Sequence, residues 1–411
     1  MAGAEDRTGD VRSLRRTTHT RRQPVNDSAS ERRRLAGLLA DKGVLTLPWL
    51  RAAVEAVPRE QFLNPGVFVD EGRTWRPITP LGTTREEWLR LAYSAETLTT
   101  QLDGHLTADQ CGEPVTGVPT SSSTDPTTVV GMIESLDLDA GHHVLEIGTG
   151  TGYSAALMCH HLGEDNVTTI EVDPEVAARA DAALEAAGFS TWTVTGDGLL
   201  GHPRRAPFDR VIATCAVRRL PYSWIRQTKP GGCILATIGS WPYGTGLAKV
   251  TVNEDRTAEG RIIGRSSFMQ ARAQTVAPVA GDLSALTAYA DSERTAKVSP
   301  LMLEEWMPAF VAQLTAPGAQ LVRATTSDGT PLLYVFDPER ESFAEFLTEG
   351  DSWVVRQGGP VALWDDVERA LIAWQDAGVP DIDAVRLRVT ADSHLYWIDA
   401  TPSLRWEHRL A

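Results

Sequence analysis

The chain of 411 residues is 42% hydrophobic and 23% charged, an ordinary globular composition with room for two or three domains. Its net charge of −15 disfavours a nucleic-acid partner, because binding of that kind depends largely on positive side chains that contact phosphate. No apolar run is long enough to cross a membrane or to act as a secretory signal, and the four cysteines, which form no Cys-x-x-Cys pair, favour a cytoplasmic protein without a metal site.

The first thirty residues are predicted to form a disordered basic arm. Residues 1–35 contain nine arginines and five acids, a net charge of +4 that leaves −19 for the rest of the chain. Their simplest interpretation is a flexible leader, and the alternative is an arm that attracts an acidic substrate. Residues 31–120 are predicted to form an N-terminal helical and loop region, with two helices before Pro58 and loops over residues 64–120.

Residues 121–275 are predicted to form a Rossmann-like domain, that is, a doubly wound and mostly parallel α/β sheet. A helix over residues 127–138, capped by Asp125 or Thr124, comes first. Short apolar strands then alternate with helices, at residues 143–147, 167–170, 191–194, 208–214 and 232–238. A sheet of this kind binds its ligand at the carboxyl ends of its strands, where the strand order reverses.

A glycine-rich turn follows the first of these strands. Three glycines let the backbone turn tightly and leave space that any Cβ atom would fill, namely Gly148, Gly150 and Gly152. Acids stand at the strand ends: Glu146 can hold a cationic amino group, Glu171 can accept both ribose hydroxyls, and Asp197 can contact an adenine edge. Together these residues predict a nucleoside ligand that carries a positive charge.

The main alternative for this turn is a dinucleotide-binding domain. Such domains space their glycines as G-x-G-x-x-G, whereas this chain has G-x-G-x-G, and Glu146 beside the turn would repel a pyrophosphate. No histidine, Tyr-Lys pair or cysteine constellation predicts a hydride-transfer site. A phosphate-binding P-loop is excluded, because no Gly-Lys-Ser/Thr sequence follows the turn.

Five segments of the chain together resemble protein-L-isoaspartate O-methyltransferases. They are residues 56–62 (AVPREQF), 123–126 (STDP), 144–153 (VLEIGTGTGY), 196–198 (GDG) and 206–212 (APFDRVI). The resemblance covers about residues 31–275 and implies a class I methyltransferase fold, with S-adenosyl-L-methionine as methyl donor and S-adenosyl-L-homocysteine as product. The cofactor-binding residues that it implies are Ser123, Glu146, Gly148, Thr149, Gly150, Thr151, Gly152, Tyr153, Glu171, Val172, Asp197 and Gly198.

The resemblance also implies the catalytic residues, Thr124 and Asp125. Thr124 lies where the family has an active-site serine and keeps the hydroxyl group, whereas Asp125 replaces a residue that is usually neutral. A substrate carboxylate with a pKa of about 4 is already ionised at neutral pH, so the reaction needs no general base. A hydroxyl group can orient one carboxylate oxygen without neutralising it, and the remaining task is alignment.

Residues 276–411 are expected to have no counterpart in the repair enzymes of this family. They are predicted to form a small C-terminal α+β accessory domain, with one helix over residues 363–374 and a hairpin of strands near 385–389 and 395–397. Six of the twelve tryptophans lie in this region and are expected mostly in its core. Substrate selection is the role that we expect for this domain.

An added domain suits one dedicated substrate better than the repair of many damaged chains. The resemblance extends to longer homologues from biosynthesis clusters for ribosomal peptides (lanthipeptides, lasso peptides and graspetides). It therefore implies tailoring of a constrained, cyclised peptide, in which a methylated aspartate collapses to aspartimide or isoaspartate. The alternatives are a general isoaspartate-repair enzyme, a small-molecule methyltransferase and a binding module without turnover. A monomer is the favoured oligomeric state.

Overall fold

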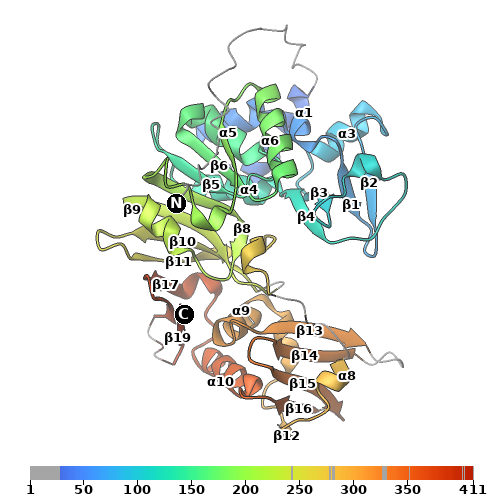
Figure 1. Ribbon diagram of the computed structural model, residues 1–411, viewed down its shortest axis with the longest axis vertical. Helices are drawn as coiled ribbons and strands as arrows, with labels where there is room; N and C mark the ends of the chain where they lie inside the picture. Colours follow the sequence, from blue (N-terminus) through green and yellow to red (C-terminus); the bar gives the residue numbers. More distant parts are fainter. Residues whose placement is uncertain are drawn as a thin grey trace, which may run out of the picture.

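The computed structural model describes residues 28–410 except residues 242–243, 277–278, 280–282, 326–330, 351, 400 and 402. Three sheets form its framework: a ten-stranded main sheet, a four-stranded N-terminal sheet and a five-stranded C-terminal sheet. In Figure 1 the N-terminal sheet lies beside the upper part of the molecule, and the C-terminal sheet occupies its lower end. The predicted basic arm, residues 1–30, lies almost entirely outside the described residues.

The parallel half of the main sheet is the doubly wound α/β unit that the sequence predicts. Its elements are α4 (Pro126–Ser135), β5 (Val144–Ile147), α5 (Tyr153–Leu162), η4 (Glu164–Asn166), β6 (Val167–Glu171), α6 (Pro174–Ala187), β7 (Trp192–Thr195), η5 (Gly198–Leu200), β8 (Phe208–Val217), α7 (Tyr222–Gln227) and β9 (Thr228–Ile238). The strand order is β7-β6-β5-β8-β9, and every neighbouring pair is parallel. The order reverses between β5 and β8, so the carboxyl ends of β5, β6 and β8 meet at the predicted ligand-binding edge.

Two helices of this unit begin at aspartate caps, of which the sequence predicts Asp125. The Asp125 side chain accepts a hydrogen bond from the Thr127 N–H at 2.9 Å at the start of α4, and Asp173 caps α6 in the same way. Successive strand residues point to opposite faces of the sheet. Val144 accordingly joins a core shared with the N-terminal helices, whereas Leu145 joins a core shared with α7 and the C-terminal residues.

Residues 64–120, which the sequence predicts to be loops, contain a four-stranded antiparallel sheet. The N-terminal elements are α1 (Ala29–Asp41), α2 (Pro48–Ala56), η2 (Arg59–Leu63), β1 (Val67–Asp70), β2 (Trp75–Ile78), α3 (Arg85–Ala92), β3 (Leu98–Leu102), η3 (Ala108–Gln110) and β4 (Pro119–Ser123). The sheet order is β2-β1-β3-β4. The prediction of loops is wrong because these strands are short and bury polar side chains, as in the fully buried Leu-Thr-Thr-Gln-Leu of β3.

Five antiparallel strands extend the main sheet beyond β9. Besides β10 (Gly246–Val252) and β11 (Ala258–Arg265), they are β17 (Val385–Val389), β18 (Ser393–Ile398) and β19 (Arg405–Arg409). The hairpin predicted near residues 385–397 is therefore present as β17 and β18, but the prediction of one separate domain over 276–411 is wrong for this part. The strand β17 pairs with β11, which would otherwise expose an edge of unpaired backbone groups.

Residues 283–376 form the second antiparallel sheet and the helices that cover it. With the short helices around them, the elements are η6 (Arg272–Gln274), α8 (Leu283–Leu286), β12 (Ser292–Thr295), η7 (Pro300–Glu304), α9 (Trp306–Thr315), β13 (Gln320–Thr325), β14 (Pro331–Asp337), β15 (Ser342–Glu349), β16 (Ser352–Gly358), α10 (Leu363–Asp376) and η8 (Ile382–Ala384). The order is β12-β16-β15-β14-β13, and α10 contacts α9, β15 and β16. Three of the six tryptophans of residues 276–411 are buried, namely Trp364, Trp374 and Trp406.

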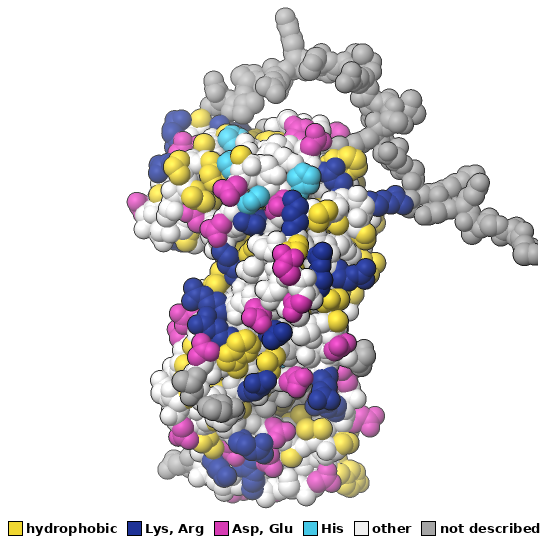
Figure 2. Space-filling model, turned by 90° about the vertical axis from the view of Figure 1, so that its left-hand side faces the viewer, with side chains coloured by type: hydrophobic (Ala, Val, Ile, Leu, Met, Phe, Trp, Pro, Cys, Tyr) yellow, Lys and Arg dark blue, Asp and Glu magenta, His cyan; other side chains and the backbone are white. Residues whose placement is uncertain are grey.

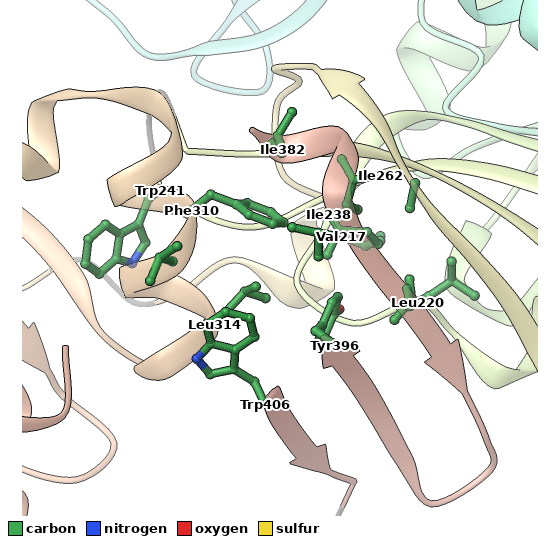
Figure 3. Packing of buried hydrophobic residues seen from close by; sticks show 14 of the residues in the cluster. Val217, Leu220, Ile238, Trp241, Ile262, Phe310, Leu314, Ile382, Tyr396 and Trp406 are labelled. Carbon is green, nitrogen blue, oxygen red and sulfur yellow. The ribbon is translucent and has the colours of Figure 1, made fainter. Parts of the chain in front are cut away.

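The C-terminal unit is joined to the main sheet through a continuous hydrophobic core. Figure 3 shows Phe310 of α9 beside Val217 and Ile238, the last residues of β8 and β9, and Leu314 of the same helix beside Trp406. The indole N–H of Trp241 adds a hydrogen bond to the Ala319 carbonyl at 2.6 Å. The second sheet is thus fixed at the edge where the parallel strands end, which is the edge that binds ligands in folds of this kind.

Charged side chains of both signs are mixed over the face of the molecule shown in Figure 2. Neither the basic nor the acidic side chains of its described residues gather in one large patch on that face. This face therefore lacks the continuous basic surface that is typical of nucleic-acid binding.

A buried histidine between β18 and the residues after β8 makes the stability of the fold depend on pH. His394 is fully buried, and its Nε2 atom lies 3.2 Å from the Leu220 carbonyl oxygen. Burial lowers the pKa of His394 to about 4, whereas the unfolded chain has a histidine pKa of about 6.5. Between these values the unfolded state binds the proton more readily, so stability is lost as the pH falls through this window.

We expect His394 to contribute about 2 kcal/mol to the loss of unfolding free energy between pH 7.5 and pH 5. Urea unfolding of the wild type and of His394→Phe at both pH values measures this contribution. The variant should lose less stability than the wild type on acidification. Equal losses in the two proteins would show that His394 does not titrate as its burial requires.

Candidate functional site

A cavity of about 660 Å³ lies at the carboxyl ends of β5 and β6. It is bordered by the glycine-rich turn after β5, by the end of β4 with the start of α4, and by residues 267–273 after β11. Thr124 lines it, together with ten of the twelve cofactor-binding residues that the sequence predicts, namely Ser123, Gly148, Thr149, Gly150, Thr151, Tyr153, Glu171, Val172, Asp197 and Gly198. The fold thus brings together residues that the chain spreads over the ends of four strands, β4, β5, β6 and β7.

The glycine-rich turn is tied to the end of the neighbouring strand. Gly150 has a φ of +54°, and its N–H donates a hydrogen bond to Glu171 Oε2 at 3.0 Å. The other oxygen, Oε1, accepts from the Asp173 N–H at 3.1 Å. Burial raises the pKa of Glu171, and these two backbone donors oppose that effect. A carboxylate held in this way still has acceptor capacity for hydroxyl groups of a ligand.

Gly152 does not line the cavity, in contrast to the prediction. It has a φ of +91°, and a Cβ atom at this position would lie 3.2 Å from Cγ of Leu184 in α6. This glycine therefore allows α5 and α6 to approach each other and leaves no space for a ligand.

Glu146 is fully buried beneath the cavity and does not line it, so the structure does not place it where the predicted cationic amino group of a ligand would bind. Alternation along β5 points Ile147 towards the cavity and Glu146 towards α5. Glu146 accepts hydrogen bonds from the hydroxyls of Ser154 and, at 2.7 Å, Thr169, and burial raises its pKa to about 7. Thr169 Oγ1 lies 2.7 Å from Thr149 Oγ1. Glu146 therefore supports the glycine-rich turn from below.

Consecutive hydroxyl residues at the end of β4 alternate in their surroundings. Ser121 and Ser123 are buried, and their hydroxyls accept hydrogen bonds from Thr100 at 3.1 Å and from Arg59 at 3.3 Å. Ser122 and Thr124 are half-buried, and neither hydroxyl has a hydrogen-bond partner within the described part of the chain. The sequence prediction includes Ser123 and misses Ser122. Counting back by two from Thr124 along the strand would have found it.

Asp125, the second predicted catalytic residue, does not line the cavity. Its N–H donates to Thr97 Oγ1 at 3.0 Å, and its side chain accepts from Thr127 N–H at the start of α4. A carboxylate that caps a helix must turn back towards the first helical N–H groups. The structure therefore gives Asp125 a structural role at the turn that carries Thr124.

Residues 267–273 form a cavity wall that the sequence motifs do not predict. Two backbone hydrogen bonds attach this segment to β8, from Ala216 N–H to the Met269 carbonyl and from Ala271 N–H to the Ala216 carbonyl, both at 2.8 Å. Arg272 forms an ion pair with Asp173 at 2.9 Å and is the only cation among the described lining residues. The segment has neither an apolar period nor a turn signature, so no local pattern marks it.

Within the described residues, no three histidine, cysteine or acidic side chains stand close enough together to bind a metal ion. No helix in the described part of the chain is both long and apolar enough to span a lipid bilayer.

Known proteins with similar sequences share the region that contains this cavity. The model of the family "Protein-L-isoaspartate(D-aspartate) O-methyltransferase (PCMT)" matches residues 109–272. The protein-L-isoaspartate O-methyltransferase of Ignicoccus hospitalis is 41% identical over 140 residues, which are 34% of this chain and 64% of that protein. The enzyme of the same name from Thermococcus onnurineus is 34% identical over 158 residues, 38% of this chain and 70% of that protein. The chain thus matches about half to two thirds of the length of its curated relatives.

A solved protein-L-isoaspartate O-methyltransferase has a similar fold. The TM-score is 0.50 at 21% sequence identity, and the match covers 92% of this chain and all of that one. A match of that extent must reach beyond residue 275, because residues 1–275 are only about two thirds of the chain. The expectation that residues 276–411 have no counterpart in such proteins is therefore wrong at the level of the fold.

We expect Gly150→Val to weaken the binding of S-adenosylhomocysteine by about 100-fold. The left-handed backbone strains a β-branched residue, and the added side chain would enter the cavity. Isothermal titration calorimetry measures the affinity. Gly163→Val is the matched control, because Gly163 has a φ of +81° and borders open space at the end of α5. Equal affinities of the two variants would contradict this placement of the cofactor.

Proposed function

The chain belongs to the protein-L-isoaspartate O-methyltransferase family, and we propose that it transfers a methyl group from S-adenosylmethionine to the carboxylate of an isoaspartyl residue in a protein or peptide. One observation carries the proposal: two free hydroxyls, those of Ser122 and Thr124, line the cavity that also contains the glycine-rich turn. A nucleoside site and a set of neutral hydroxyl donors thus share one cavity, as methyl transfer to a carboxylate requires.

The cavity residues fit S-adenosylmethionine, the cofactor of this family. Gly150 leaves backbone space at the turn, Glu171 presents a carboxylate for the ribose hydroxyls, and Asp197 borders the cavity where the adenine would lie. In the transfer, a carboxylate oxygen of the substrate bonds to the methyl carbon while the carbon–sulfur bond breaks, and the sulfur keeps the electron pair in the product S-adenosylhomocysteine.

The residues of this chain contribute alignment and the exclusion of water. The substrate carboxylate is ionised at neutral pH, so methyl transfer to it needs no general base. The hydroxyls of Ser122 and Thr124 can donate hydrogen bonds to its oxygens, and because they are neutral they leave the carboxylate nucleophilic. Apolar side chains that line the cavity, among them Val129, Ile147 and Phe268, limit the water that would compete for the carboxylate.

An assay with two peptides of identical sequence tests this function, one with isoaspartate and one with aspartate at the same position. We expect a methyl ester on the isoaspartyl peptide, detected by mass spectrometry or by transfer of a labelled methyl group. Transfer to neither peptide would contradict the proposal.

Within this assay, Thr124→Ala should lower kcat by about 10–100-fold, because it removes a hydrogen bond to a charged group. The affinity for S-adenosylhomocysteine should stay within about twofold, and Thr124→Ser should keep most of the activity, since the hydroxyl remains. A Thr124→Ala protein with an unchanged kcat would remove Thr124 from the mechanism.

A second candidate is methylation of an unmodified aspartate in a cyclised ribosomal peptide. The observation in its favour is the place of the C-terminal unit, which α9 fixes at the carboxyl ends of β8 and β9. Isoaspartate methylation stays the first candidate, because the curated relatives carry that name and the solved member matches beyond residue 275. A cyclised aspartyl peptide in the same assay separates the two. An ester that loses methanol to give aspartimide would favour tailoring, and an unmodified peptide would exclude it.

A further inference from the structure

Arg59 is a fully buried arginine that makes no ion pair within the described residues. Its guanidinium donates to main-chain carbonyls and to one hydroxyl. The acceptors are the carbonyls of Ala92 (2.7 Å), Ser94 (3.0 Å), Glu96 (3.3 Å), Ser123 (3.4 Å) and Thr124 (3.3 Å), and the Ser123 hydroxyl (3.3 Å). Burying a cation is costly unless its N–H groups find acceptors, so these oxygens determine the place of the side chain. Burial lowers the pKa of Arg59 to about 10, which leaves it charged at neutral pH.

The acceptors of Arg59 come from two segments that are far from it in sequence. One segment is the end of α3 with the loop that follows it, residues 92–96, and the other is the end of β4 with the turn into α4. Arg59 itself belongs to η2, so one guanidinium joins three parts of the chain. On the turn, Ser123 is directed at Arg59, whereas its neighbours Ser122 and Thr124 carry the free hydroxyls at the cavity.

The same guanidinium also lies near a tyrosine on the opposite side of the cavity. The Arg59 Cζ atom lies 5.9 Å from the centre of the Tyr153 ring. Tyr153 is the first residue of α5, directly after the glycine-rich turn, and it lines the cavity. Arg59 does not line the cavity itself. Arg59 therefore contacts both the turn that carries Thr124 and the first residue of α5, which follows the glycine-rich turn, from outside the cavity.

We propose that Arg59 is a positioning residue, which fixes the Thr124 hydroxyl relative to the glycine-rich turn at the separation that methyl transfer requires. The proposal rests on the proposed function, because the place of Thr124 matters only if the chain methylates a carboxylate. A planar guanidinium presents five N–H groups in a fixed arrangement, whereas lysine has one ammonium group on a flexible stem. Arg59→Lys therefore keeps the charge but cannot bind both segments at once.

The test compares Arg59→Lys with Arg32→Lys in the full-length protein. Arg32 is a suitable control because it is also buried and also donates to a carbonyl and a hydroxyl, those of Glu55 (2.7 Å) and Ser28 (2.6 Å). Unlike Arg59, it donates to no residue that lines the cavity. We expect Arg59→Lys to lower kcat by at least about tenfold while the affinity for S-adenosylhomocysteine changes less than about threefold. Arg32→Lys should leave kcat within about twofold of the wild type.

Hydrogen–deuterium exchange supplies a readout that does not depend on activity. Amide exchange over residues 121–128 should accelerate in Arg59→Lys and stay unchanged in Arg32→Lys. An unchanged kcat in Arg59→Lys, or equal losses of kcat and of cofactor affinity, would overturn the positioning role. If Arg59→Lys does not fold, Ser123→Ala removes one acceptor and should lower kcat about two- to fivefold at constant cofactor affinity; no change would overturn the role.

The exchange experiment also separates this proposal from the proposed function. A wild-type protein that methylates neither peptide refutes the function. In that case faster exchange over residues 121–128 in Arg59→Lys would still show that Arg59 fixes the turn, and unchanged exchange would refute the positioning role as well.

Discussion

The hydrogen bond from the Gly150 N–H to the Glu171 carboxylate is the interaction on which the site depends. It joins the turn after β5 to the end of β6, so the two central strands of the parallel half present one common edge. Only a residue that tolerates a φ of +54° brings its N–H to this carboxylate without strain. A buried carboxylate needs such donors, and the second one comes from the backbone of Asp173. The cavity is built around this pair of bonds.

Several polar residues of the motifs act on the site indirectly. Glu146 accepts hydrogen bonds from Ser154 and Thr169 beneath the glycine-rich turn, Asp125 caps α4, and Arg59 holds the turn that carries Thr124. Each of them satisfies buried or terminal backbone and side-chain groups that would otherwise be costly. The chemistry of methyl transfer to a carboxylate asks for orientation more than for acid–base catalysis, and such supports provide orientation. These three motif residues therefore act by fixing the glycine-rich turn and the turn that carries Thr124, and none of them lines the cavity.

The C-terminal region is divided between two structures. Its last three strands complete the edge of the main sheet, and the preceding residues form a second sheet whose helix α9 lies at the ends of β8 and β9. A continuous apolar core joins them, so the second sheet has a fixed place near the edge that contains the cavity (Figure 3). A solved family member matches beyond residue 275, which makes this region part of a wider architecture.

The sequence alone determined the parallel half, the glycine-rich turn and the family, because local signals encode them: short apolar strands, positive-φ glycines and the capping residues Asp125 and Asp173. It did not determine which motif residues meet a ligand. Successive residues of a strand point to opposite sides, which turns Glu146 away from the cavity and Ser122 towards it. Gly152 lies against α6 and so does not border the cavity. Only the tertiary structure decided three further features: the cavity wall at residues 267–273, the pairing of β17 with β11, and the polar N-terminal sheet. Each depends on contacts between segments that are far apart in the chain, and no local sequence period encodes such contacts.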